Sequence, residues 1–320
     1  MKLTRFMPLI GVTVILLFGA EYSAQAQGGA SSGSSTAASV EPFLGRWDLT
    51  VKGPDGEYPS WLELQQEDGH LKGRLQGRRG NVRPLEEASF SNGILTFGFP
   101  KYHWAFEARV VGTGLVGTAT GPNGTPLTWV GSRAPSLDRT KSPKWERPIQ
   151  LFNGKDLSGW KMDQPGPPVW TVQDGTLVSP GHGPELIYDG SFTDFKLHIE
   201  FKCGEKSNSG IFLRGRYEVQ VENDSPQQGP SHHTGGVYGY LAPSPELPRT
   251  TGEWQMFDIT LVGRRVTVVQ NGTTVIDNQE IPGITGGALD SKEALPGPIY
   301  LQGSEPGQVA FRNIILIPAR

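Results

Sequence analysis

The sequence predicts an all-β protein, in which a small antiparallel β-barrel-like domain precedes a larger jelly-roll sandwich. Few segments have the period of an amphipathic helix, and many short segments alternate apolar and polar residues. Glycine (43 residues) and proline (26 residues) are abundant and separate these segments. A chain of 320 residues has the length of about two domains.

The first 26 residues have the pattern of a secretory signal peptide. Lys2 and Arg5 precede a mostly apolar segment, residues 6–20, which is short for a membrane span. Residues 24–26 (AQA) fit a small-x-small cleavage site, so we expect the mature chain to begin near Gln27. An uncleaved anchor is the alternative. We expect an exported protein, periplasmic or extracellular, without a stable membrane span after cleavage.

The net charge limits which partners the protein can bind, and the cysteine count limits which covalent bonds can stabilise it. The formal net charge is −3 and no long basic run occurs, so nucleic acid and anionic membrane surfaces are not expected partners. Cys203 is the only cysteine, which excludes an intrachain disulfide. We expect this residue to lie buried at the end of a strand. No feature of the sequence indicates the oligomeric state.

Composition divides the remaining chain into four segments. Residues 27–40 are small and polar and predict a flexible leader, and residues 134–147 carry two prolines and no periodicity, as an inter-domain linker would. Between them, residues 41–133 contain about seven short strand patterns, which predict the barrel-like domain. Residues 148–320 contain about a dozen, including residues 235–241 and a hairpin at Asn271 and Gly272, which predict the two-sheet jelly roll.

Three neighbouring residues of the first domain, Tyr102, His103 and Trp104, are candidates for ligand binding. Aromatic faces suit the apolar faces of pyranose rings, so these residues could line the mouth of a sugar site. The alternative is a strand whose aromatic side chains belong to the core.

Residues 207–222 (SNSGIFLRGRYEVQVE) predict two strands joined by a turn at Gly215. Because side chains of a strand alternate between its faces, the apolar residues of the second strand share one face. The opposite face gathers Arg214, Glu218, Gln220 and Glu222. This polar row predicts either a ligand site or an ordinary solvated face of an antiparallel sheet.

Several motifs follow one another through the second domain: LFNGKDLSGW (151–160), WTVQDGTL (170–177), DFKLHIEF (194–201), NSGIFLR (208–214), YEVQVEND (217–224), TGGVYG (234–239), GEW (252–254), VVQNG (268–272), GPIYLQG (297–303) and VAFRNI (309–314). This order resembles the 3-keto-disaccharide hydrolase family, formerly a domain of unknown function. The resemblance covers the second domain only. It implies a concanavalin-like jelly roll and a glycosidase-type hydrolase acting on glycosides whose C3 hydroxyl is oxidised to a ketone.

Such a substrate has an acidic proton at C2 and a leaving group at C1. Proton abstraction, elimination of the aglycone and hydration would need a base at C2–H and a positive group or a metal at the enolate oxygen, with an acid for the leaving group as a further option. We predict Glu218 or His198 as the base, with Glu200 and Arg214 completing the catalytic cluster if their strands lie side by side. Alternatively, Glu200 and Arg214 form an ordinary cross-strand ion pair.

Four further residues are predicted to bind the substrate. Gln220 would orient a sugar hydroxyl, and Tyr238 lies among glycines that let a ligand approach the backbone. Asn208 either contacts the sugar or caps the turn before its strand. Trp254 either stacks on the sugar or belongs to the core.

Glu222, His232 and His233 are candidate ligands of a divalent cation, although their spacing matches no fixed zinc motif. The cofactor prediction therefore stays open between none and a divalent metal ion. The sequence as a whole predicts an exported enzyme with a carbohydrate substrate. Two alternatives are a non-catalytic carbohydrate-binding protein using the same face, and a structural surface protein whose polar row is only solvated.

Overall fold

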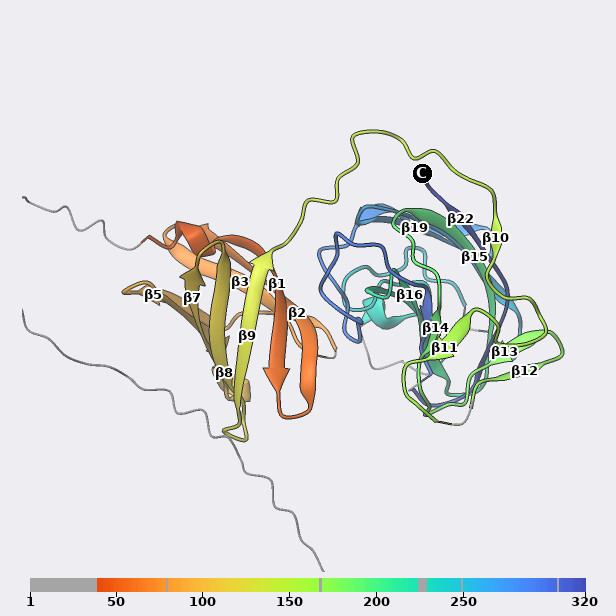
Figure 1. Ribbon diagram of the computed structural model, residues 1–320, viewed down its shortest axis with the longest axis horizontal. Coiled ribbons are helices and arrows are strands. Elements are labelled where there is room, and N and C mark those ends of the chain that lie inside the picture. Colours follow the sequence, from red (N-terminus) through yellow and green to blue (C-terminus); the bar gives the residue numbers. More distant parts are fainter. Residues whose placement is uncertain (1–38, 79, 167–168, 224–228, 249, 304) are drawn as a thin grey trace, which may run out of the picture. The chain divides into compact units, whose positions relative to one another are not determined.

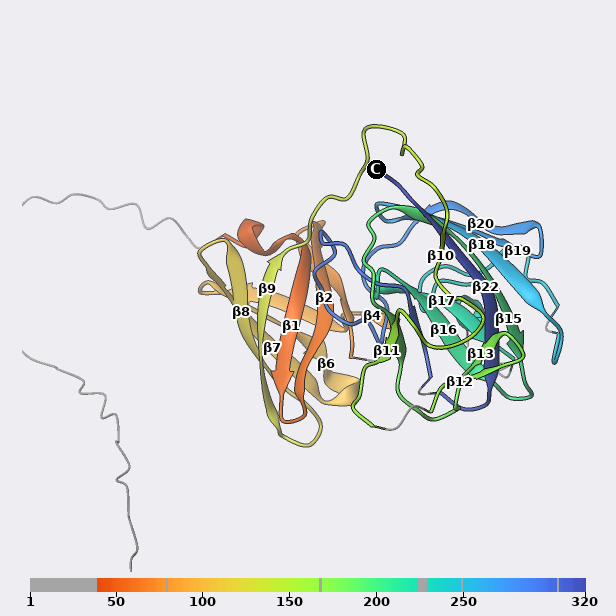
Figure 2. The same ribbon diagram turned by 45° about the vertical axis from the view of Figure 1, so that its right-hand side comes forward.

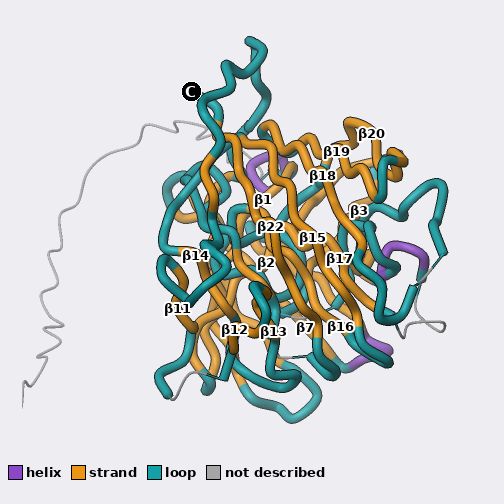
Figure 3. The backbone as a smooth tube through the Cα atoms, turned by 90° about the vertical axis from the view of Figure 1, so that its right-hand side faces the viewer, coloured by secondary structure: helices purple, strands orange, loops and turns teal. Residues whose placement is uncertain are grey.

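The computed structural model describes residues 39–320, except residues 79, 167–168, 224–228, 249 and 304. The predicted signal peptide and almost all of the predicted leader lie outside the described residues. Within the described part, the only helices are three short 3-10 turns: η1 (Glu41–Phe43), η2 (Pro100–Tyr102) and η3 (Pro230–His232). No helix there is long and apolar enough to cross a membrane. The tube in Figure 3 shows strands and loops making up nearly all of the backbone, as an all-β protein requires.

The first part of the chain forms one antiparallel sheet of nine strands (Figure 1). Its strands are β1 (Gly45–Gly53), β2 (Gly56–Glu67), β3 (His70–Gln76), β4 (Val82–Pro84), β5 (Glu87–Ser91), β6 (Ile94–Phe99), β7 (Trp104–Val111), β8 (Gly114–Thr120) and β9 (Pro126–Arg133). Their spatial order is β4-β3-β2-β1-β9-β8-β7-β6-β5, and contacts between β3 and β5 bring the two ends of the sheet together. The predicted barrel-like fold is confirmed, and we call this unit the barrel sheet.

The remaining strands form a second, larger sheet and a third, smaller one. The larger sheet contains β10 (Ile149–Gln150), β12 (Thr171–Gln173), β13 (Thr176–Val178), β15 (Phe195–Cys203), β18 (Gln255–Val262), β19 (Arg265–Gln270), β20 (Thr273–Glu280) and β22 (Val309–Pro318). The smaller sheet contains β11 (Trp160–Met162), β14 (Leu186–Tyr188), β16 (Asn208–Leu213), β17 (Tyr217–Glu222) and β21 (Tyr300–Leu301), in the order β11-β14-β21-β16-β17. Figure 2 shows β15, β18, β19 and β22 curving side by side in the larger sheet.

Apolar side chains from both sheets share one core, which makes the pair a sandwich. On β15, Leu197 and Ile199 are buried, whereas the alternate residue His198 is partly exposed. On the smaller sheet, Ile211 and Val219 belong to the same core. The strand period of two therefore supplies one apolar face from each sheet, as a jelly-roll sandwich requires. The predicted jelly-roll class is confirmed.

Two local predictions are confirmed and one is wrong. Cys203 is buried at the end of β15, and the Asn271–Gly272 turn joins β19 to β20, with φ values of 49° and 81° that suit an Asn-Gly hairpin. Residues 235–241, in contrast, are not a strand. They form consecutive turns with isolated bridges only, because Gly235 and Gly239 adopt positive φ angles that interrupt an extended chain.

Residues 38–320 form one compact unit, and specific contacts join the barrel sheet to the sandwich. Trp61 on β2 packs in the sandwich core, and its Nε1 donates hydrogen bonds to Tyr240 Oη (2.9 Å) and to the carbonyl of Ile284 (3.1 Å). Tyr240 Oη in turn lies 2.8 Å from Gln76 Oε1 on β3. The domain boundaries at residues 133 and 148 remain a prediction.

Candidate active site

The two strands around Gly215 form the hairpin that their sequence predicts. β16 pairs antiparallel with β17, and Phe212 lies opposite Glu218 in the register. The polar row of β17, however, is not exposed: Glu218, Gln220 and Glu222 are each only 2% exposed. The alternative of a solvated polar face is therefore wrong for this strand. Burying a carboxyl group costs free energy unless it is hydrogen-bonded or paired, and such costly groups cluster at functional sites, so the row marks a candidate site.

A cavity of about 310 Å³ opens on the face of the smaller sheet that points away from the sandwich core. Its walls come from β16, β17 and β21, from the residue before β14, from the turn-rich segment after η3 and from the loop before β21. The barrel sheet contributes residues of β2 and of the loop between β3 and β4. Most of the lining groups are polar. The residues that carry the argument below are Tyr58, Arg78, Glu185, Asn208, Glu218, Gln220, Tyr238, Gln302 and Glu305.

Glu218 is fixed in the middle of this cavity wall by its backbone. Its N–H donates to Thr285 Oγ1 (3.0 Å), and its carbonyl accepts a hydrogen bond from the N–H of Tyr238 (3.0 Å). Space for the carboxyl group exists because residue 210 on the neighbouring strand is glycine. A Cβ atom at Gly210 would lie 2.1 Å from Glu218 Oε1.

The electrostatic surroundings of Glu218 favour its protonated form. Burial raises the pKa of this carboxyl group well above its ordinary value, and the negative charges of Glu305 and Glu185 raise it further. Burial, together with Glu218 and Glu305, also raises the pKa of Tyr238 to about 12. A carboxyl group whose pKa is raised by burial is a stronger base once ionised, which suits it to general acid–base chemistry.

Amide groups lie next to this carboxyl group and are oriented by one another. Gln220 Nε2 donates to Asn208 Oδ1 (2.7 Å), and Asn208 Nδ2 lies 3.4 Å from Glu305 Oε2. Within the described part of the chain, the buried Oε1 atoms of Gln220 and Gln302 have no hydrogen-bond partner. Buried acceptors of this kind normally find a partner, and hydroxyl groups of a sugar would supply one.

Four of the predicted site residues therefore line one cavity: Glu218, Gln220, Asn208 and Tyr238. Sequence reasoning missed the three residues that complete it, Glu185, Gln302 and Glu305. They lie beside the short strands β14 and β21, which join β16 in the smaller sheet: Leu301 pairs with both Leu186 and Ile211. The only signal was that Gln302 belongs to the GPIYLQG motif, because strands of two or three residues show too little alternation to reveal a face.

His198 and Glu200 do not join Glu218, and the predicted four-residue cluster is not formed. Both residues lie on β15 in the larger sheet, where the neighbouring strands are β22 and β18, whereas β17 belongs to the smaller sheet. His198 Nδ1 lies 2.8 Å from Asp258 Oδ1, and Glu200 accepts a hydrogen bond of 2.6 Å from Arg312 Nε. These are ordinary cross-strand pairs of a sheet face. The ion-pair alternative holds for Glu200, with Arg312 in place of Arg214.

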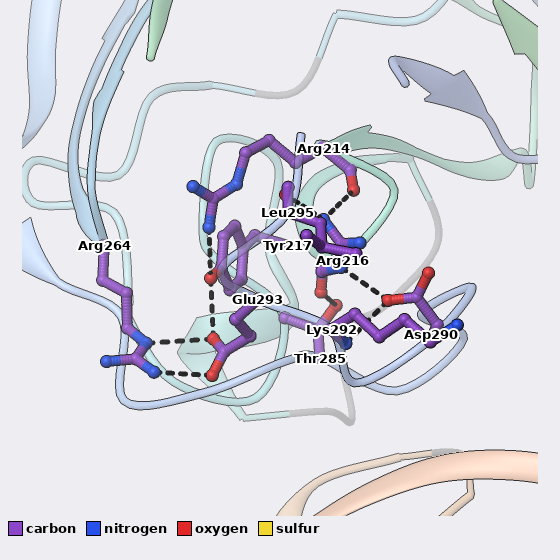
Figure 4. Close-up of polar contacts among 9 residues, drawn as sticks. All are labelled: Arg214, Arg216, Tyr217, Arg264, Thr285, Asp290, Lys292, Glu293 and Leu295. Carbon is purple, nitrogen blue, oxygen red and sulfur yellow. Dashed lines mark hydrogen bonds and ion pairs between the residues drawn. The ribbon is translucent and has the colours of Figure 1, made fainter. Parts of the chain in front are cut away.

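Arg214 is also held away from the cavity, in a buried network drawn in Figure 4. Its Nη2 donates to Tyr217 Oη (2.8 Å), and this hydroxyl donates to Glu293 Oε1 (2.6 Å). Arg264 binds both oxygens of Glu293 through Nε (3.0 Å) and Nη2 (2.6 Å). The guanidinium group of Arg214 therefore orders the loop before β21 and does not face the Glu218 carboxyl group.

Trp254 and the histidines predicted as metal ligands do not line the cavity of Glu218. Trp254 precedes β18 and lies under two cations, with Arg312 Cζ 3.9 Å and Lys202 Nζ 5.0 Å from its ring centre. It lines a different depression and not the cavity of Glu218.

His233 Nδ1 lies 2.9 Å from Glu246 Oε1, and His232 packs edge-on against Tyr238 at 4.6 Å. Among the described residues, no group of three His, Cys, Asp or Glu side chains is placed to hold a metal ion.

Comparison with known protein families assigns the sandwich to one of them. The family model described as a 3-keto-alpha-glucoside-1,2-lyase-like domain matches residues 147–317, which is more than half of the chain. The chain belongs to this family. The match leaves the barrel sheet outside, and it includes every residue of the cavity except those contributed by the barrel sheet.

The chain is also similar to individual curated proteins and solved structures. A 3-keto-disaccharide hydrolase of Bacteroides thetaiotaomicron is 23% identical over 167 residues, covering 40% of this chain and 57% of that protein. The chain thus matches somewhat more than half the length of this curated relative. Among solved structures, two candidate glycosyl hydrolases of Parabacteroides distasonis each cover 53% of this chain. One is 33% identical with a TM-score of 0.46 over 82% of its own chain, and the other 20% identical with a TM-score of 0.44 over 92%.

Proposed function

We propose that this chain cleaves 3-keto-glycosides in the cavity around Glu218. The observation that carries the proposal is a fully buried carboxyl group, with a raised pKa, that faces a cavity lined by hydrogen-bonding side chains. Ordinary glycosidases use two carboxyl groups flanking an oxocarbenium-like transition state. A 3-keto sugar instead offers an acidic C2–H bond, from which a single carboxylate can take the proton.

In the first half of the proposed reaction, the ionised Glu218 takes the proton from C2. The electron pair of the C2–H bond forms the enolate, whose oxygen at C3 accepts hydrogen bonds from the amide donors of the cavity, with Gln220 and Asn208 nearest in the sheet. Collapse of the enolate breaks the C1–O bond. The aglycone oxygen takes up a proton, for which the Tyr238 hydroxyl is the candidate donor.

In the second half, water adds across the C1–C2 double bond of the unsaturated ketone. The Tyr238 oxygen, ionised in the first half, removes a proton from the water, the hydroxyl oxygen bonds to C1, and the protonated Glu218 returns its proton to C2. The sum is one 3-keto-glycoside and one water giving one 3-keto sugar and one alcohol. A carboxyl group with a raised pKa can serve both as base and as acid in such a cycle.

A test compares the wild-type chain with Glu218→Gln, using 3-keto-trehalose or methyl 3-keto-glucoside as substrate. We expect the wild type to release 3-keto-glucose. The amide keeps the shape of the side chain but cannot act as a base, so turnover should fall by about two to four orders of magnitude. Substrate affinity, measured by calorimetry, should change little. Binding without product in the wild type would favour the non-catalytic carbohydrate-binding alternative and reject the enzyme.

Export is a second part of the proposal. Lys2 and Arg5, the apolar segment that follows and the AQA sequence at residues 24–26 support it. Expression of the full chain in a Gram-negative host followed by fractionation tests it. We expect the processed chain in the periplasm or the medium, and a version without residues 2–26 in the cytoplasm. Equal distribution of the two versions would reject a signal peptide.

A further inference from the structure

The barrel sheet encloses a second cavity, of about 440 Å³, that the family match does not include. Aromatic rings form much of its wall: Phe99, Tyr102, Trp104, Phe106 and Trp129. A volume of this size holds a small organic molecule of one or two rings. The cavity is therefore a candidate binding site in the part of the chain to which the proposed reaction gives no role.

Two rings of this wall, Phe106 and Trp104, continue a stack that begins at Phe97 behind the wall. Phe97 and Phe106 are parallel at 4.9 Å, and Trp104 stacks on Phe106 at 5.8 Å. Phe97 is buried, Trp104 and Phe106 are half-buried, and Tyr102 is 44% exposed at the cavity edge. Exposed aromatic surface that continues a buried stack favours a further planar ring, since offset stacking adds to the gain from burial.

The buried polar side chains of the cavity, Ser60 and Gln76, are occupied by the protein itself, which favours a planar ring over a sugar at its base. Ser60 Oγ donates to the carbonyl of Gln76, and Gln76 Nε2 donates to the carbonyls of Gly77 (2.9 Å) and Gly80 (2.8 Å). The Gln76 Oε1 atom is taken by Tyr240. A pyranose would need unoccupied donors and acceptors for its hydroxyl groups, whereas an aromatic ring does not.

Two residues belong to both cavities. Tyr58 and Arg78 line the cavity of Glu218 as well as that of the barrel sheet. Arg78 Cζ lies 5.3 Å from the centre of the Tyr58 ring, so the two side chains form one pair at the boundary. A molecule with a polar sugar at one end and an aromatic ring at the other would meet a matching wall on each side of this pair.

We propose that the barrel cavity binds the aromatic aglycone of a 3-keto-glycoside whose sugar occupies the cavity of Glu218. This inference rests on the proposed function, and it assigns the barrel sheet a role in substrate selection. The preferred substrates are then aryl glycosides, with the glycosidic bond located near Tyr58 and Arg78. Catalysis stays with Glu218, so loss of the aromatic wall should weaken binding of aryl substrates and leave alkyl substrates unaffected.

The test uses a matched pair of substrates, 2-naphthyl and methyl 3-keto-glucoside, with Trp104→Ala in the barrel cavity. We expect KM for the naphthyl substrate to be about tenfold below that for the methyl substrate in the wild type. Trp104→Ala should remove this advantage without changing KM for the methyl substrate. Trp254→Ala, which deletes another half-buried tryptophan outside both cavities, is the control and should keep the wild-type preference.

A binding measurement separates this inference from the proposed reaction. Calorimetry with unoxidised 2-naphthyl and methyl glucosides needs no turnover, and the naphthyl compound should bind about tenfold more tightly to the wild type. If Trp104→Ala unfolds the chain, Tyr102→Ala at the exposed edge replaces it and should reduce the preference by about threefold. Equal affinity of the two glucosides, or a preference unchanged in these variants, would overturn the inference even if 3-keto-glycosides are cleaved.

Discussion

Gly210 on β16 lies against the carboxyl group of Glu218 on β17, because a Cβ atom at residue 210 would come within 2.1 Å of Glu218 Oε1. The backbone of Gly210 is ordinary extended strand, with no positive φ that would by itself call for glycine. Glycine at residue 210 therefore leaves room for the carboxyl group of Glu218. A substitution at this residue would move the proposed base without changing its chemistry.

Gly210→Ala should reduce turnover of a 3-keto-glycoside on the order of a hundredfold, since the new methyl group displaces the carboxyl group by about 1 Å or more. The melting temperature should fall by only a few degrees. Gly229→Ala is the matched control, because its Cβ would lie 4.0 Å from its nearest neighbour, His232 Nδ1. Unchanged turnover in Gly210→Ala would remove Glu218 from the reaction.

The pH dependence of kcat/KM should report the raised pKa of Glu218. The base must be ionised to take the C2 proton, so activity is low below this pKa and rises as the pH passes through it. Because burial and the neighbouring Glu305 and Glu185 raise the pKa, the rise should occur above 4.5, the ordinary value for a glutamate. Glu305→Gln removes one of these charges and should shift the rise toward lower pH. A rise centred at or below 4.5 would contradict this account.

His198→Ala and Glu200→Gln should both keep wild-type kcat within about twofold, because their side chains belong to the larger sheet. Their pairs with Asp258 and Arg312 are partly exposed and contribute about 0–1 kcal/mol each to the free energy of unfolding. Steady-state kinetics of the two variants beside Glu218→Gln measure this. A loss of turnover in either variant comparable to that of Glu218→Gln would restore the cluster that the sequence predicted.

Glu293→Gln should destabilise the chain by about 3–5 kcal/mol, since it leaves the nearly buried guanidinium group of Arg264 without its charged partner. The urea midpoint of unfolding measures this change. Glu146→Gln breaks the exposed ion pair with Arg320 and is the control, with an expected change of about 1 kcal/mol or less. Equal midpoints for the two variants would show that the network in Figure 4 is not a source of stability.

The sequence predicted the fold class and the hairpin of β16 and β17 well, because strand alternation and turn residues are local signals. It placed Glu218 and Gln220 on one face from their spacing alone. It predicted residues 235–241 wrongly, since glycines there support turns although the residues between them are typical of strands. Four of the eleven candidate site residues in the second domain, Asn208, Glu218, Gln220 and Tyr238, line the cavity of Glu218.

What the sequence alone determined was which residues share a strand face, since that follows from a period of two. Only the tertiary structure decided which strands are neighbours. It placed β15 and β17 in different sheets, brought Glu185, Gln302 and Glu305 to Glu218 through short strands, and buried the polar row beneath other segments. These outcomes depend on contacts between residues far apart in the chain, and no local pattern encodes them.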